Sequence, residues 1–280
     1  MAEAPNILVF DSGLGGLTVY REVVAALPHA RMLYVADDAF FPYGGRDEAA
    51  LITRLIELMG ELIASHRPDL VIIACNTAST LVLPQLRARF QVPFIGTVPA
   101  IKPACALSVS KRVSVLGTQA TIAREYTRAL IRDFANGADI TLVGSGALAA
   151  LAEAQLRGEA VADAAIAAEL EPCFVDADGR RTDTVVLACT HYPLLIDRLT
   201  ALAPWPVRFI DPAPAIARRA LELMGALSGP STGAPAGPQP AAKGQILFTS
   251  GRPPSPALAA ALSGFGLGET APDSGCQAAV

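Results

Sequence analysis

The stretch Asp69-Leu-Val-Ile-Ile-Ala-Cys-Asn-Thr77 decides the fold, because Asp183-Thr-Val-Val-Leu-Ala-Cys-Thr-His191 repeats it farther along the chain. The two stretches align at one constant offset, which pairs Cys75 with Cys189. Each is a short apolar run that ends in Cys and a polar residue, with a helical pattern after it. Such a run is typical of a buried parallel strand that leads into a helix. The repeat therefore predicts two related units, each with a cysteine at the carboxyl end of a strand.

Strand and helix patterns alternate along the whole chain, which indicates parallel sheets flanked by helices. We expect an α/β fold of two related lobes with the active site in the cleft between them, because ligands bind beyond the carboxyl ends of parallel strands. The second lobe is expected to be inserted into the first. The expected bounds are 1–98 and 210–265 for the first lobe, 99–209 for the second, 228–243 for a flexible linker rich in Pro, Gly, Ala and Ser, and 268–280 for a loose tail.

The remaining elements follow from local patterns. Leucines at 51, 55, 58 and 62 lie on one face of a helix, and packing in the core explains this stripe without any function. A helix is also expected over 81–90, after the first cysteine. The further strands are expected at 6–10, 31–36, 93–96, 112–116, 140–143, 207–210 and 245–249, the last of them completing the first sheet.

The composition excludes several classes of protein. Of the 280 residues, 52% are hydrophobic and 17% are charged, which is typical of a globular chain. The apolar runs are too short to cross a bilayer, and no signal segment precedes the first strand, so we expect a cytosolic protein. A net charge of −4 without a basic block does not favour nucleic acid as a partner. The five cysteines are widely and irregularly spaced, so reduced thiols are expected.

Glycine-rich and hydroxyl-rich turns follow several of the expected strands. Asp11-Ser-Gly-Leu-Gly-Gly16 lacks the G-x-G-x-x-G spacing of dinucleotide sites, but its glycines allow a tight turn that presents backbone amides at a helix N-terminus. Asp11 itself is either a capping residue or a functional one. The hydroxyls of Thr118 and Thr121 either cap the next helix or hold a carboxylate there.

Two thiols at one cleft allow three kinds of chemistry. One Cys could act as a nucleophile with His191 as its base, which leaves the other thiol idle. Cys75, Cys189 and His191 could bind a metal, although only three ligands are evident. In the third hypothesis the thiols are an acid–base pair on opposite sides of one carbon, and only this hypothesis needs both. A helix N-terminus lowers the pKa of a thiol, so we expect reactive thiolates near neutral pH.

Nearly the whole chain, up to about Gly251, resembles the glutamate racemases of the aspartate/glutamate racemase family. The resemblance rests on a combination of motifs, each of which is weak alone. They are Asp11-Ser-Gly-x-Gly-Gly16, Pro42-Tyr-Gly44, Ala74-Cys-Asn-Thr-Ala78, Gly117-Thr118 with Thr121, and Cys189-Thr-His-Tyr-Pro193. The resemblance implies an isomerase that racemises glutamate without pyridoxal phosphate, another cofactor or a metal, and that supplies D-glutamate for peptidoglycan. It also implies a homodimer.

The resemblance further implies a role for each matching residue. Cys75 would take the α-proton of D-glutamate with the help of Asp11, and Cys189 that of L-glutamate with the help of His191. Glu153 matches an acidic position of the second lobe, although Ser145-Gly146 stands where the family commonly has Cys-Pro. The residues implied in substrate binding are Asp11, Ser12, Pro42, Tyr43, Gly44, Asn76, Thr77, Thr118, Thr121, Thr190 and His191.

Two alternatives stay open from the sequence. An aspartate or hydantoin racemase shares the paired cysteines, although the motif Cys189-Thr-His-Tyr-Pro193 favours glutamate. A non-catalytic binding protein on the same scaffold would be indicated by loss of either cysteine, and both are present. Cys105, Cys173 and Cys276 receive no role.

Overall fold

The structure is a computed structural model that describes residues 4–228 and 244–269. The expected linker at 228–243, apart from Ser228, lies outside the described residues, and so does the expected tail beyond Glu269. None of the helices in the described part of the chain is both long and apolar enough to cross a lipid bilayer.

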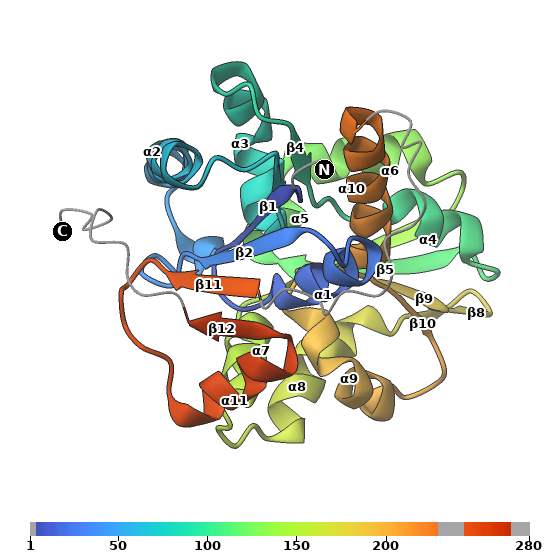
Figure 1. The fold of residues 1–280 in the computed structure, drawn as a ribbon. Coiled ribbons are helices and arrows are strands. Elements are labelled where there is room, and N and C mark those ends of the chain that lie inside the picture. The colour runs from blue at the N-terminus through green and yellow to red at the C-terminus, as the bar shows by residue number, and fades with distance from the viewer. Residues whose placement is uncertain (1–3, 229–243, 270–280) are drawn as a thin grey trace.

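Two parallel sheets form the framework, which confirms the predicted fold class (Figure 1). The larger sheet has the strand order β12-β11-β2-β1-β3-β4 and the smaller one β10-β9-β5-β6. The strands of the larger sheet are β1 (Asn6–Asp11), β2 (Arg31–Ala36), β3 (Leu70–Ile73), β4 (Phe94–Gly96), β11 (Gly244–Phe248) and β12 (Leu267–Glu269). Those of the smaller sheet are β5 (Arg112–Thr118), β6 (Asp139–Ser145), β9 (Thr184–Ala188) and β10 (Arg208–Ile210).

The repeat in the sequence is a repeat in topology. In chain order, the strands of the smaller sheet lie as second, first, third and fourth, and β2-β1-β3-β4 of the larger sheet have the same order. In each sheet the first strand pairs with the third, through Leu8 opposite Val71 and through Ser114 opposite Val185. Cys75 and Cys189 both follow the third strand of their sheet, so they occupy equivalent positions.

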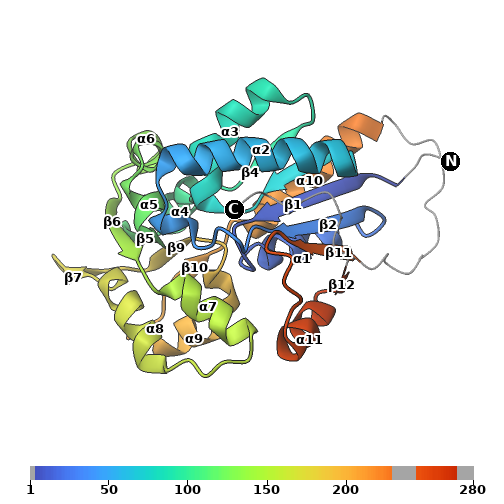
Figure 2. The same ribbon diagram turned by 90° about the vertical axis from the view of Figure 1, so that its left-hand side faces the viewer.

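Helices cover both faces of the larger sheet (Figure 2). The strand β1 is buried on both faces, since Ile7 and Val9 pack into one core and Leu8 and Phe10 into the other. The leucine stripe of α2 is buried as expected. The first core contains residues of α1 (Leu17–Ala26), α10 (Ala213–Ser228) and α11 (Pro256–Gly264), and the second contains residues of α2 (Glu48–His66) and α3 (Asn76–Arg89).

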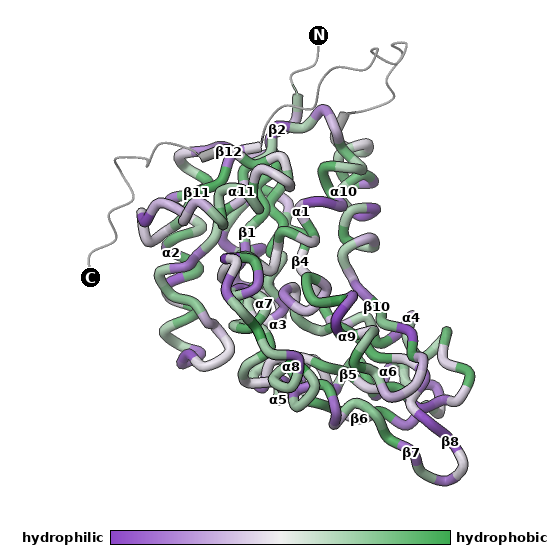
Figure 3. The backbone as a smooth tube through the Cα atoms, turned by 90° about the horizontal axis from the view of Figure 1, so that it is seen from below, coloured by the Kyte–Doolittle hydropathy of each residue, from purple (hydrophilic) through white to green (hydrophobic). Residues whose placement is uncertain are grey.

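The smaller sheet is covered in the same way. One core contains residues of α7 (Leu148–Leu156), α8 (Asp163–Leu170) and α9 (Ile196–Leu202), and the other contains residues of α4 (Ile101–Leu107) and α6 (Glu125–Phe134). The short α5 (Gln119–Ala123) follows β5. A hairpin of β7 (Asp176–Ala177) and β8 (Arg180–Arg181) projects from this lobe and is largely hydrophilic (Figure 3).

Four expectations about the elements need correction. The helix after Cys75 begins at Asn76 and not at Leu81, because its first turn is polar and lacks the apolar spacing that was used to find it. A short 3-10 helix, Tyr192–Leu195, separates Cys189 from α9, so the second thiol does not lead directly into an α-helix. The strand β11 is not the last, since β12 pairs beside it and includes Gly268. Finally, β10 pairs with β9, so the chain returns to the larger sheet only with α10.

Candidate active site

The two cysteines line one small cavity, as the sequence predicts. Thirteen residues from both lobes form its walls, and its volume is about 20 Å³. This is room for about one water molecule. The lining residues are Ser12, Phe41, Pro42, Tyr43, Gly44, Cys75, Asn76, Thr77, Thr118, Ala149, Cys189, Thr190 and His191.

A buried carboxylate, that of Asp11, acts electrostatically on the first thiol. Asp11 is fully buried at the end of β1, where its carboxylate accepts hydrogen bonds from the backbone amide of Gly13 at 2.9 Å and from the hydroxyl of Thr190 at 3.0 Å. Burial raises the pKa of Asp11, while His191 and these two donors act in the opposite direction. Asp11 is therefore a carboxyl group that accepts a proton more readily than an exposed aspartate does.

The first thiol is not the activated thiolate expected from a helix N-terminus. Burial raises the pKa of Cys75 to about 12, and the negative charge of Asp11 adds to this effect. The backbone amide of Ala78, in the first turn of α3, and the hydroxyl of Ser12 lower the pKa but do not outweigh burial. Cys75 therefore holds its proton at neutral pH, and the expectation of a lowered pKa at this position is wrong.

The second thiol has a histidine and a glutamate behind it. The sulfur of Cys189 lies 3.7 Å from Nδ1 of His191, and Nε2 of the same ring lies 3.0 Å from Oε1 of Glu153. Burial lowers the pKa of His191, but the bonds to Cys189 and Glu153 outweigh it and set the pKa well above its ordinary value. The two thiols therefore have different neighbours: the negative charge of Asp11 acts on Cys75, whereas Cys189 lies beside the ring of His191.

Glu153 also joins the two lobes. Its Oε1 accepts a hydrogen bond from the backbone amide of Leu14 at 2.8 Å, and its Oε2 pairs with Arg157 at 2.9 Å. Burial raises the pKa of Glu153, but the bonds from His191, Leu14 and Arg157 outweigh it, so the pKa lies below its ordinary value. Glu153 is therefore ionised at neutral pH and matched to a charged His191.

We expect Glu153→Gln to lower the free energy of unfolding at pH 7 by about 2 kcal/mol, because hydrogen bonds to a charged group are lost in a buried site. The ionised form stabilises the protein above the unfolded-state pKa of about 4.5, and this contribution is lost as the pH falls through the lower folded-state pKa. Urea unfolding of wild type and Glu153→Gln, at pH 7 and at several pH values below 4.5, measures the difference between their free energies of unfolding. If this difference stays constant or grows as the pH falls, Glu153 is not ionised in the folded protein.

Hydroxyl and amide groups line the side of the cavity near Cys75. The hydroxyls of Thr77, Thr118 and Thr121 lie within 2.9 to 3.3 Å of one another across the two lobes. Thr118 also caps α5 by accepting from the amide of Thr121. Both polar atoms of the Asn76 side chain are buried without a hydrogen-bond partner. Because buried polar groups are nearly always paired, the orphaned amide of Asn76 indicates a ligand position.

The structure brings together the residues singled out from the sequence. Eleven of them line the cavity, while Asp11, Thr121 and Glu153 stand directly behind the lining. The hydroxyl of Tyr43 donates to Asp37 at 2.5 Å, so only the rest of this residue is available to the cavity. Two lining residues, Phe41 and Ala149, were missed. The aromatic loop before Pro42 was a signal for Phe41, whereas nothing in the sequence marks Ala149.

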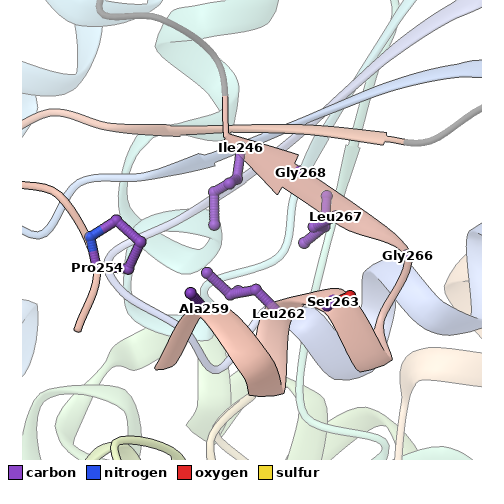
Figure 4. A pocket seen from close by; sticks show the side chains of 8 residues that line it. All are labelled: Ile246, Pro254, Ala259, Leu262, Ser263, Gly266, Leu267 and Gly268. Atoms are coloured by element: carbon purple, nitrogen blue, oxygen red, sulfur yellow. The ribbon is translucent and has the colours of Figure 1, made fainter. Parts of the chain in front are cut away.

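A larger cavity of about 330 Å³ lies elsewhere, between α11 and the strands β11 and β12 (Figure 4). None of its lining residues is titratable, so it offers no acid–base chemistry. They are Ile246, Pro254, Ala259, Leu262, Ser263, Gly266, Leu267 and Gly268. The described residues also contain no group of three His, Cys, Asp or Glu side chains placed to hold a metal ion. The acid–base groups therefore point to the smaller cavity.

A cavity that places an acid–base thiol from each of two related α/β lobes at one point defines a racemase-type site. The chain belongs to the Asp/Glu/hydantoin racemase family, whose sequence profile matches residues 7–220. It is 52% identical over 262 residues to the glutamate racemase of Brucella canis, which covers 93% of this chain and 92% of that protein. It is 54% identical over 268 residues to that of Rhizobium meliloti, with 95% and 93% covered.

A solved structure supports the same relationship. Escherichia coli glutamate racemase, in complex with L-glutamate and the activator UDP-MurNAc-ala, superposes with a TM-score of 0.83 at 38% identity. The superposition covers 96% of this chain and 99% of that one. The likeness therefore includes both lobes.

Proposed function

We propose that this protein is an isomerase that interconverts L-glutamate and D-glutamate without a cofactor, by proton transfer at the α-carbon. The observation that carries the proposal is the placement of Cys75 and Cys189 at equivalent positions of two related sheets, in the lining of one cavity. The identity to glutamate racemases over nearly the whole chain favours glutamate over aspartate and hydantoins. None of the lining residues is a lysine, which a pyridoxal phosphate enzyme needs for its Schiff base.

The surroundings of the two thiols suggest a direction for each proton transfer. Cys75 holds its proton, and the sulfur of Cys189 lies 3.7 Å from Nδ1 of His191. In this proposal, Cys189 acts on L-glutamate as a thiolate and takes the α-proton, and the Cys75 thiol gives its proton to the opposite face of the carbanion. Release of D-glutamate then leaves a protonated Cys189 and a Cys75 thiolate, which are the acid and the base that the reverse reaction from D-glutamate needs. A turnover of D-glutamate to L-glutamate therefore restores the starting states directly. Between two turnovers of L-glutamate, Cys75 must gain one proton from solvent and Cys189 must lose one to solvent.

Neutral donors would hold the charged substrate. The hydroxyls of Thr77, Thr118 and Thr121 and the backbone amides at the start of α3 suit a carboxylate, because a helix N-terminus favours an anion. The unpaired side chain of Asn76 offers both a donor and an acceptor. In this proposal Ser12, Gly44 and Thr190, which also line the cavity, complete the binding set.

Substrate needs more room than the present cavity has. A volume of about 20 Å³ is far below the ~300 Å³ or more of a typical ligand pocket. We infer that the two lobes, 1–98 with 210–265 and 99–209, separate to admit glutamate and close over it. The contact of Glu153 with Leu14 and that of Thr190 with Asp11 are made across this division and would break on opening.

The test is exchange of the α-proton in D2O, followed by NMR on L-glutamate, D-glutamate, L-aspartate and a hydantoin. We expect deuterium incorporation together with inversion for both glutamate enantiomers, without any added cofactor. Inversion of aspartate or of the hydantoin, with glutamate unchanged, would overturn the assignment of substrate. No exchange with any of the four would favour a non-catalytic binding protein on this scaffold.

The proposed substrate also suggests a metabolic role for the protein. D-glutamate from this reaction would supply peptidoglycan synthesis, and we propose a cytosolic homodimer. Self-association could cover some of the exposed apolar side chains, which are Leu107, Val109, Tyr126 and Leu221. Sedimentation velocity over a range of protein concentrations distinguishes a dimer from a monomer.

A further inference from the structure

A buried carboxylate outside the cavity has no role in the chemistry described above. Asp37 follows β2 and is completely buried. Its Oδ1 accepts hydrogen bonds from Arg54 and from Thr249, and its Oδ2 accepts from Arg54 and from Tyr43. A buried carboxylate is tolerated only when it is paired and hydrogen-bonded, and Asp37 meets this condition with four donated bonds.

The donors to Asp37 come from three separate parts of the first lobe. Arg54 lies on α2, Thr249 follows β11, and Tyr43 belongs to the short 3-10 helix Tyr43–Gly45. The backbone amide of Asp37 also donates to the carbonyl of Asp11 at 2.9 Å. Asp37 therefore ties Tyr43 to the carboxyl ends of the strands β1 and β2, where Asp11 also lies.

The segment held in this way forms one wall of the cavity. Phe41, Pro42, Tyr43 and Gly44 all line it. The ring of Phe41 lies 5.5 Å from the ring of His191. A Cβ placed on Gly44 would lie 3.3 Å from Cβ of Thr118, so the backbone there comes close to the second lobe.

We propose that Asp37, through Arg54, Thr249 and Tyr43, is a positioning residue that holds the wall Phe41–Gly44 in place for substrate binding. This inference rests on the proposed function, since the wall matters there because glutamate binds against it. The anchor also implies that the wall moves with the first lobe, so opening separates this wall from Thr118 and His191. Asp37 touches neither thiol, so the proton transfers do not depend on it directly.

The test compares wild type with Asp37→Asn and Tyr43→Phe, and with Asp38→Asn as a matched control. Asp38 is the next residue and accepts hydrogen bonds from the backbone amide and the hydroxyl of Ser250, but it makes no bond to Tyr43. Steady-state racemisation of both glutamate enantiomers gives KM and kcat, and hydrogen exchange by mass spectrometry reports on residues 40–46. Tyr43→Phe retains the ring and the buried carboxylate, so it serves if Asp37→Asn does not fold.

We expect Asp37→Asn to raise KM for both enantiomers about tenfold, which is the scale of one lost charge-assisted bond, while kcat changes less than about threefold. Backbone hydrogen exchange in residues 40–46 should also be faster in Asp37→Asn than in wild type. Tyr43→Phe should change KM in the same direction. The double variant, which combines Asp37→Asn with Tyr43→Phe, should have a KM close to that of Asp37→Asn, because both changes break the same link. Asp38→Asn should leave KM and this exchange within about twofold of wild type.

Equal effects of Asp37→Asn and Asp38→Asn on KM, or a lowered Tm with unchanged KM and unchanged exchange, would overturn the inference. Additive effects in the double variant would overturn the link through Tyr43. If wild type does not racemise glutamate, the proposed function falls by itself. The exchange of residues 40–46 then decides the positioning role, because that measurement needs no activity.

Discussion

Cys75→Ser and Cys189→Ser each lose about 10²- to 10⁴-fold in the rate of racemisation, the range that a positioned acid or base contributes. A serine hydroxyl has nearly the size of a thiol, but its proton is held far too tightly for it to act as the base. Both thiols line the cavity and neither forms a disulfide, so the loss reflects proton transfer and not a broken crosslink. Circular dichroism with each enantiomer as the starting substrate measures the rate.

The two variants should differ in the exchange that remains. In Cys75→Ser, Cys189 is still present to take the α-proton of L-glutamate and to return deuterium to the same face. In Cys189→Ser, exchange should be confined to D-glutamate. Cys105→Ser is the control, since that buried thiol lies on α4, outside the cavity lining, and should keep wild-type activity. Full activity in either active-site variant would show that the repeat in the sequence reflects the fold alone and not a pair of catalytic thiols.

The strands and the equivalent positions of the two cysteines were predictable because both follow from local sequence patterns, whereas most of the other candidate site residues were named through the resemblance to a family. The apolar run 31–36 matches β2 residue for residue, and the second cysteine repeat contains β9. The repeat around the two cysteines predicted equivalent positions, and the strand order of the two sheets confirms this. Hydroxyl-rich turns after strands lie at the cavity, because the carboxyl ends of parallel strands meet at one edge.

The features that could not be predicted from the sequence depend on packing between segments that lie far apart in the chain. The raised pKa of Cys75 arises from burial and from Asp11, which lies more than sixty residues earlier in the chain. Ala149 lines the cavity through the placement of α7, and an alanine carries no chemical signal. The early start of α3 was hidden because its polar first turn faces the cavity and not the core.

The same packing predicts that Gly15→Ala lowers kcat/KM about 10²-fold, although Gly15 has no side chain that could take part in the reaction. A Cβ at this position would lie 2.4 Å from Nδ1 of His191 and 2.6 Å from Oγ1 of Thr190. The histidine would have to move, which breaks its alignment with both Cys189 and Glu153. A displacement of about 1 Å at a catalytic group is enough for a loss of this size.

In Gly15→Ala, the rate of α-proton exchange should fall by different amounts for the two enantiomers of glutamate. Exchange of L-glutamate, which depends on Cys189 and His191, should fall more than exchange of D-glutamate, which depends on Cys75. Gly225→Ala makes the same chemical change on α10, where an added Cβ meets nothing within 4 Å, so its activity should equal that of wild type. Equal activity of Gly15→Ala and Gly225→Ala would show that the position of the imidazole tolerates displacement. In that case the close packing of the first-lobe turn against His191 would not govern the second thiol.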